Sequence, residues 1–173
     1  MSTGQTIFAI GAFVLLTTIL QGVYTSLSNV GTDIESAQDG ILETTIATSY
    51  SELANGLAFD NVTSNSDTAL FSPTVLTYPP AAEAGEDSIK DFDDFDDFNG
   101  YSEVRTAGNS NRRYRTNFTV SYVDTNNIQT TVAYRTYVKR LDMKTWRVFP
   151  PPVPDEVLDT LMTTLVMGYF HFD

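Results

Sequence analysis

The strongest constraint in this sequence is an N-terminal segment without charge. The first 32 residues contain no Asp, Glu, Lys or Arg, and the first basic residue of the chain is Lys90. Residues 7–23 are almost entirely apolar, interrupted only by Thr17, Thr18 and Gln21. A helix that is apolar on every face has to be covered by lipid or by other helices. One end of this chain therefore avoids water, while the acidic remainder does not.

The apolar segment fits neither of the two usual N-terminal types. A secretory signal peptide begins with basic residues, but residues 1–6 contain none, and residues 21–24 make a poor cleavage site. A conventional membrane anchor carries Lys or Arg on its cytoplasmic flank, which is also missing. The apolar run of about 17 residues is at the lower end of the length that crosses a bilayer. A short basic leader removed just before Met1 explains both absences, and we state it as a hypothesis.

The hydrophobic pattern predicts one helix from about Thr3 to about Gly56, on the order of 80 Å long. We divide this helix region, residues 1–57, into an apolar half (1–27) and an amphipathic half (28–57). Weak helix formers at residues 21–22 and 28–31 predict a kink or an unwound turn. Ser2 and Gln5 stand at capping-box spacing, so Ser2 is the expected cap of the first turn.

The remainder of the chain predicts a connector and a sheet. Residues 58–100 form a connector rich in small and polar residues, with a short strand expected at 69–76. In residues 101–173 a period of two predicts strands at 114–123, 129–142 and 146–149. Turns are expected at 124–127 and 142–145. Residues 157–172 fit either a helix or a strand. The predicted fold class is α+β, with an antiparallel sheet packed against the second half of the helix.

A run of acidic and aromatic residues closes the connector at residues 91–100. Phenylalanine recurs at every third position, with aspartates between. Clustered carboxylates suit calcium, but the spacing of an EF-hand loop is not met. We therefore favour a turn that buries its phenylalanines and leaves its carboxylates in water, with an ion site as the alternative. The candidate calcium ligands are Asp91, Asp93, Asp94, Asp96, Asp97 and Asn99.

The N-terminal half resembles a type IV pilin. The resemblance rests on Met1 at the start, the apolar stretch beyond residue 20, Tyr24, and an amphipathic half that leads into a β-rich region. Gln5 stands where the family usually has Glu, and Gly22 where it often has Pro. An amide accepts a weaker hydrogen bond from an N-terminal amine than a carboxylate does. The segment Asp96–Tyr101 also resembles the Asp-Asp-aromatic-Asn-Gly segment of pilins of the mannose-sensitive haemagglutinin type.

This resemblance implies a processing and assembly pathway. A prepilin peptidase cuts before the apolar segment, the new N-terminus is methylated, and the assembly machinery moves the subunit from a single-pass position in the inner membrane into an extracellular filament. The main partner is then another copy of the chain, and the C-terminal segment is a strand, which gives a sheet of about four strands. The implied processing and assembly residues are Met1, Gln5, Phe8, Phe13, Leu16, Leu20, Gly22 and Tyr24.

Composition and motifs argue against several other functions. A net charge of -12 and a pI near 4.2 disfavour nucleic acid as a partner. The chain has no cysteine, its one histidine is His171, and no catalytic motif is present, so we expect neither an enzyme nor a resident cofactor beyond the calcium alternative. Asn61 and Asn117 each begin a glycosylation acceptor triplet.

Three functions remain open on these residues. The first is a filament subunit serving adhesion, motility, DNA uptake or secretion. The second is a minor pseudopilin of a type II secretion apparatus, which has the same fold and a short, tip-located role. The third is a membrane-anchored domain that binds calcium or sugar.

Overall fold

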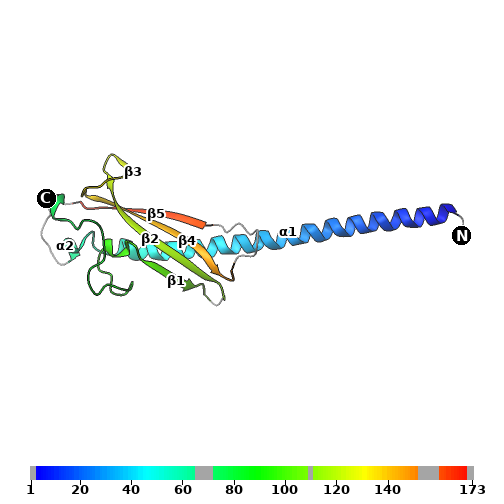
Figure 1. The fold of residues 1–173 in the computed structure, drawn as a ribbon, viewed down its shortest axis with the longest axis horizontal. Coiled ribbons are helices and arrows are strands. Elements are labelled where there is room, and N and C mark those ends of the chain that lie inside the picture. Colours follow the sequence, from blue (N-terminus) through cyan, green and yellow to red (C-terminus); the bar gives the residue numbers. More distant parts are fainter. Residues whose placement is uncertain (1–2, 65–71, 109–110, 152–159, 171–173) are drawn as a thin grey trace. The chain divides into compact units, whose positions relative to one another are not determined.

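The computed structural model combines one long helix with an antiparallel sheet, which confirms the predicted α+β class (Figure 1). It describes residues 3–64, 72–108, 111–151 and 160–170. The chain divides into two compact units, Met1–Asp39 and Gly40–Asp173.

Helix α1 spans Thr3–Asn55 without interruption, close to the predicted bounds. The kink or unwound turn expected at residues 21–22 and 28–31 is not seen, since helical structure continues through both (Figure 1). Threonine hydroxyls in this stretch bond to the helix itself: Thr25 Oγ1 donates to the Gln21 carbonyl (2.9 Å) and Thr32 Oγ1 to the Asn29 carbonyl (2.8 Å). These bonds satisfy polar side chains without leaving the helical conformation.

The sheet lies wholly in the second unit, and all its pairings are antiparallel. Its order is β1-β2-β4-β5, with β3 paired to the end of β2. The C-terminal strand β5 falls inside the segment where the sequence left helix and strand open. The strands are β1 Ser102–Thr106, β2 Arg113–Asp124, β3 Asn127–Thr131, β4 Val138–Phe149 and β5 Thr160–Gly168.

Two predictions about the strands are wrong. The expected strand 129–142 is divided, because β3 ends at Thr131 and β4 begins only at Val138. The expected turn at 142–145 lies inside β4, where Asp142 to Thr145 pair with β2 on one side and β5 on the other. Thr145 is buried there, and its hydroxyl is 3.0 Å from that of Thr116. Two-sided pairing outweighs the turn preference of these polar residues.

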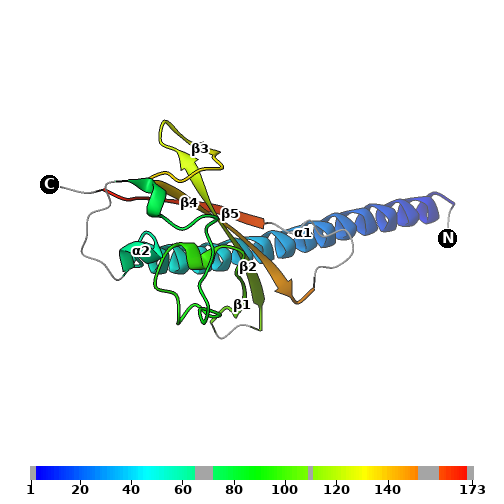
Figure 2. The ribbon, with the colours of Figure 1, turned by 60° about the vertical axis from the view of Figure 1, so that its left-hand side comes forward.

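The connector 58–100 contains short helical turns. Helix α2 covers Asn61–Ser64, and 3₁₀ turns cover Pro73–Val75 (η1) and Asp96–Phe98 (η2). The short strand expected at 69–76 is therefore wrong from residue 72 onward, and residues 69–71 lie outside the described residues. The connector returns to the chain just after α1 through an isolated bridge between Ala58 and Asp94. Figure 2 shows the connector, in green, beside the last turns of α1.

The main core joins the last turns of α1 to the sheet, as predicted. Tyr50 is fully buried, and its ring meets that of Phe118 edge-on at 4.8 Å between centroids. Its hydroxyl donates to Glu103 Oε2 at 2.5 Å. Burial in the core, followed by this bond to Glu103, raises the pKa of Tyr50. The other core residues are Ile46, Ala54, Phe92, Phe95, Phe98, Ala107, Tyr114, Val120, Leu141 and Met143.

Candidate functional sites

The first candidate site is the apolar part of α1. Every described residue from Thr3 to Ala37 is exposed within this chain. The predicted assembly residues have exposed side chains: Phe8 is 82% exposed, Phe13 70% and Tyr24 76%. Leu16 and Leu20 are exposed as well. This much apolar surface in one segment marks a site of contact with lipid or protein.

By length and composition α1 qualifies as a membrane span, with a mean hydropathy of 2.0 over its most apolar window. A signal sequence near the N-terminus has the same properties. The long apolar helix is thus compatible with membrane anchoring. Inside the segment, Thr17 Oγ1 donates to the Phe13 carbonyl (2.9 Å) and Thr18 Oγ1 to the Leu15 carbonyl (2.8 Å). These hydroxyls have partners without water, which a setting in lipid or in a helix bundle requires.

The glycines of this segment have no packing role within the subunit. A Cβ placed on Gly4, Gly11 or Gly22 meets no heavy atom within 4 Å. Gln5 lies exposed in the first turns of α1. Met1 and the expected cap Ser2 lie outside the described residues, so their predicted roles stay predictions.

The second candidate site is the acidic loop 91–100. Its three phenylalanines are buried, as predicted, but Asp94, Asp96 and Asp97 are buried too, so the expectation of solvated carboxylates holds only for Asp91 and Asp93. The loop binds its own backbone. Asp97 Oδ2 accepts the backbone N–H groups of Asp93 (2.9 Å) and Asp94 (3.0 Å), and Asp94 Oδ1 accepts that of Asp96 (2.6 Å).

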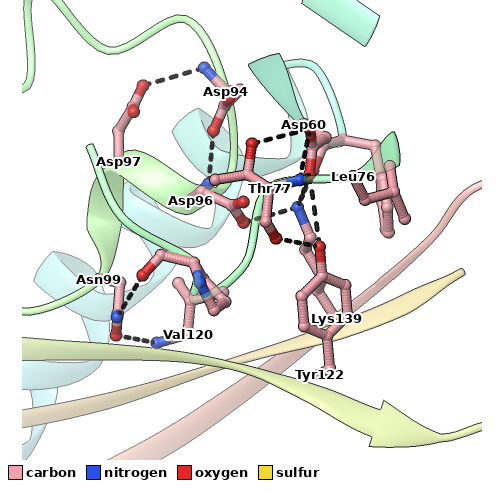
Figure 3. Close-up of polar contacts among 12 residues, drawn as sticks. Asp60, Leu76, Thr77, Asp94, Asp96, Asp97, Asn99, Val120, Tyr122 and Lys139 are labelled. Atoms are coloured by element: carbon pink, nitrogen blue, oxygen red, sulfur yellow. Dashed lines mark hydrogen bonds and ion pairs between the residues drawn. The ribbon is translucent and has the colours of Figure 1, made fainter. Parts of the chain in front are cut away.

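Asn99, one of the candidate ligands, has a structural role instead. Its Nδ2 donates to the Pro80 carbonyl (2.8 Å), and its Oδ1 accepts the backbone N–H of Val120 (2.9 Å). The side chain thereby links the connector to β2 (Figure 3). With its carbonyl oxygen already bonded, Asn99 is a poor ligand for an ion.

A buried ion-pair network lies beside this loop (Figure 3). Lys139 on β4 is fully buried, and its Nζ lies 2.7 Å from Asp60 Oδ2, 2.6 Å from Asp96 Oδ1 and 2.9 Å from the Phe59 carbonyl. The contacts with Asp60 Oδ2 and the Phe59 carbonyl are hydrogen bonds, and the contact with Asp96 Oδ1 is an ion pair. The sequence analysis did not predict this network, because the partners of Lys139 lie far from it in the sequence.

Asp60 is the centre of this network. Besides Lys139, its carboxylate accepts the backbone N–H of Thr77 (3.0 Å to Oδ2) and that of Val62 (3.3 Å to Oδ1). Burial acts to raise the pKa of Asp60, but the charge and hydrogen bond of Lys139 outweigh it and hold the pKa below its usual value. For Asp96 the effect of burial, which raises the pKa, is larger than the effect of Lys139, which lowers it. The pKa of Asp96 therefore rises to about 7.

The structure also brings a residue from elsewhere in the connector to the acidic loop. Glu83, Asp94 and Asp97 each place a carboxylate oxygen within 4.8 Å of the others. Glu86, Asp93 and Asp97 form a second such group. The sequence analysis did not include Glu83 and Glu86 among the candidate ligands, because no local spacing relates them to the loop.

The two glycosylation candidates differ in setting. Asn61 is half-buried at the start of α2, whereas Asn117 is exposed in the middle of β2. The Asn117 Oδ1 accepts a hydrogen bond from Ser102 Oγ (2.8 Å). His171 lies outside the described residues.

Comparison with known proteins gives no further assignment. No family model, no curated protein and no solved structure matches this chain.

Proposed function

We propose that this chain is the structural subunit of a type IV pilus-like helical filament. The observation that supports the proposal most is the apolar part of α1, whose large side chains are exposed on every face. Association of such helices removes apolar surface from water at roughly 25 cal/mol per Å². The proposal involves no catalysed reaction.

The length of the uncharged helix favours a filament over a simple anchor. The helical residues from Thr3 to Thr32 carry no charge. At 1.5 Å per residue they extend about 45 Å, whereas the hydrocarbon core of a bilayer is about 30 Å thick. Copies of the same helix, offset along a common axis, cover this whole length. A head-to-tail contact that does not close into a ring produces a helical fibre.

The exposed glycines support the same proposal. In lipid the hydrophobic effect does not drive helices together, so their association depends on close packing. Small residues allow that close packing. Gly4, Gly11 and Gly22 are free of neighbours within the subunit, so their space is open to a second helix.

The proposed route follows the pilin resemblance. The chain first spans the inner membrane once, a prepilin peptidase exposes Met1 for methylation, and the pilus assembly machinery transfers the subunit into an extracellular filament on the cell surface. Gln5 takes the place of the acid that pairs with the amine of a neighbouring subunit, and it does so with a neutral hydrogen bond.

A membrane-anchored cation-binding domain is the second candidate, because several buried carboxylates converge in the connector. Such a domain stays monomeric in detergent and is missing from surface fibres. A minor pseudopilin shares the filament mechanism and differs in stoichiometry. A major subunit dominates the fibres sheared from cells, and a minor one does not.

The test compares two substitutions at one position in cells that export the chain through a pilus system. Phe13→Leu keeps the apolar surface, and we expect it to leave the amount of chain in sheared fibres near the wild-type level. Phe13→Asp places a charge in the apolar segment, and we expect at least a tenfold loss from the fibre fraction. Immunoblots of the membrane fraction show whether the variant is made and inserted. Equal fibre amounts for the two variants, or no chain in wild-type fibres, contradict the proposal.

A further inference from the structure

Three carboxylates from two parts of the connector converge on one point. Glu83, Asp94 and Asp97 each contribute an oxygen, and the three oxygens lie within 4.8 Å of one another. Calcium binds oxygen at about 2.3–2.6 Å, so two ligands on opposite sides of one ion are about 5 Å apart. The spacing therefore fits a single ion held by all three residues.

Each of these residues also has a buried oxygen without a hydrogen-bond donor. Within the described residues, no donor reaches Glu83 Oε2, Asp94 Oδ2 or Asp97 Oδ1. The Asp94 side chain belongs to a residue that is fully buried, and Asp97 is only 1% exposed. Their other oxygens hold the loop backbone, as described above. A buried carboxylate oxygen without a partner is costly, and a bound cation removes that cost.

Within the described ranges, no salt bridge joins a basic side chain to Glu83, Asp94 or Asp97. The ion pairs of Lys139 go to Asp60 and Asp96 instead, although its charge also acts on Asp94. Burial, together with the charges of Asp96 and Asp97, raises the pKa of Asp94 to about 8. Burial also raises the pKa of Asp97 to about 6. The fold thus places several carboxyl groups close together where their charge is poorly solvated.

We propose that Glu83, Asp94 and Asp97 bind a calcium ion. The donor set is carboxylate oxygen only, which suits a hard cation and not zinc or copper. The ligands come from two irregular segments, a geometry that calcium tolerates and that magnesium, with its strict octahedron, accepts less well. Glu86 and Asp93, which group with Asp97, lie at the more exposed side of the site, and water completes the coordination.

The ion connects residue 83 of the connector to the loop 94–97 that packs on the core. Its role is to fix the connector against the domain. The proposal does not depend on filament formation, because every ligand belongs to the unit Gly40–Asp173. The competing explanation is a proton shared between Asp97 and Glu86, whose carboxyl groups interact.

Isothermal titration of the full-length chain in detergent tests the proposal. The protein is first treated with EDTA, and calcium chloride is then added at neutral pH, with magnesium chloride as the parallel titrant. We expect one calcium per chain with a dissociation constant of about 0.1–1 mM, in the range of extracellular calcium modules, and at least tenfold weaker binding of magnesium.

Three variants locate the site. Asp94→Asn and Glu83→Gln each remove one charged ligand, and we expect each to weaken calcium binding at least tenfold. Glu83 is the less buried of the two, so its variant remains informative should Asp94→Asn fail to fold. The control is Asp91→Asn, since Asp91 is exposed in the same loop and bonds Ser88 Oγ at 2.6 Å. It should bind as the wild type does. Absence of calcium binding, equal binding of magnesium, or unchanged binding in Glu83→Gln overturns the proposal.

Discussion

Lys139 Nζ lies 2.7 Å from Asp60 Oδ2, and both side chains are completely buried, although 79 positions separate the two residues in the sequence. The contact joins the beginning of β4, an inner strand of the sheet, to the residue just before α2. Asp96 completes the network from the acidic loop, so one lysine holds together three segments of the second unit.

Replacing Lys139 tests how much this network contributes to the free energy of unfolding. Lys139→Met leaves Asp60 and Asp96 buried without a counter-charge, which costs about 3–5 kcal/mol. Lys144→Met is the matched control, because Lys144 lies on the same strand but is exposed, and we expect a change within about 0.5 kcal/mol. Urea unfolding of the full-length chain in mild detergent measures both, followed by the fluorescence of Trp146, the one tryptophan. Equal effects of the two substitutions contradict the account.

The depressed pKa of Asp60 gives the network a defined pH dependence. The folded pKa lies below the ordinary value of 3.8, so ionised Asp60 adds stability that is fully present above about pH 4. That stability is lost as the pH falls through the folded pKa. The free energy of unfolding of the wild type should therefore exceed that of Asp60→Asn at pH 6, and the difference should shrink as the pH falls below the ordinary pKa of 3.8. Comparing the two proteins in urea at each pH cancels the titrating groups that do not interact with Asp60. Asp96 does interact with it, so the same comparison is made in the Asp96→Asn background. A difference that stays constant or grows on acidification argues against this role.

The phenylalanines of the acidic loop should contribute strongly to stability. Phe98 is fully buried, with its ring centroid 5.2 Å from that of Phe92 and 5.3 Å from that of Phe118. Phe98→Ala should cost about 3–5 kcal/mol. Phe170→Ala serves as the control, since Phe170 is 76% exposed and its loss should change stability by less than about 0.5 kcal/mol. Thermal unfolding followed by circular dichroism separates the two, and similar melting temperatures for both variants exclude the assigned role of Phe98.

Gly22 offers a test of helix packing between copies. A Cβ at Gly22 meets nothing within the subunit, and glycine is a poorer helix former than leucine by nearly 1 kcal/mol. Gly22→Leu should therefore leave the monomer helical and membrane-bound while lowering the amount of fibre several-fold, because the larger side chain keeps neighbouring helices apart. Gly85→Ala is not a usable control, since Gly85 has a φ of +107° that strains any other residue. Gly22→Ala, which adds only a methyl group at the same position, serves instead, and we expect it to lower the amount of fibre much less than Gly22→Leu does. An unchanged fibre yield in Gly22→Leu would show that Gly22 does not lie in the interface between helices.

The sequence predicted the helix and the fold class because their signals are local. A long apolar run followed by apolar residues at helical spacing specifies α1 from its first to its last turn. The strand β4 was divided wrongly, since Asp142 to Thr145 have the composition of a turn. The alternation that continues through Leu141, Met143 and Thr145, all of which are buried, was the signal that would have joined the two halves.

The polar sites were harder to predict because their partners are distant in the sequence. Nothing near Asp96 or Asp60 indicates that Lys139 will reach them, and nothing near Glu83 indicates Asp94 and Asp97. A run of aspartates in water and a run buried by its intervening phenylalanines have the same sequence pattern. The aspartates of this chain are buried because the connector folds back beside the end of α1, where Ala58 and Asp94 form a bridge. That long-range contact is not visible in the local sequence.

The central claim is that the apolar part of α1 is covered by copies of itself. Electron cryo-microscopy of the surface fibres sheared from cells that make this chain tests it most directly. The account predicts a fibre core built from residues 7–27 of many copies in contact, with the sheets outside. Fibres that lack the chain, together with a chain that remains entirely in the membrane and extracts as a monomer, contradict it.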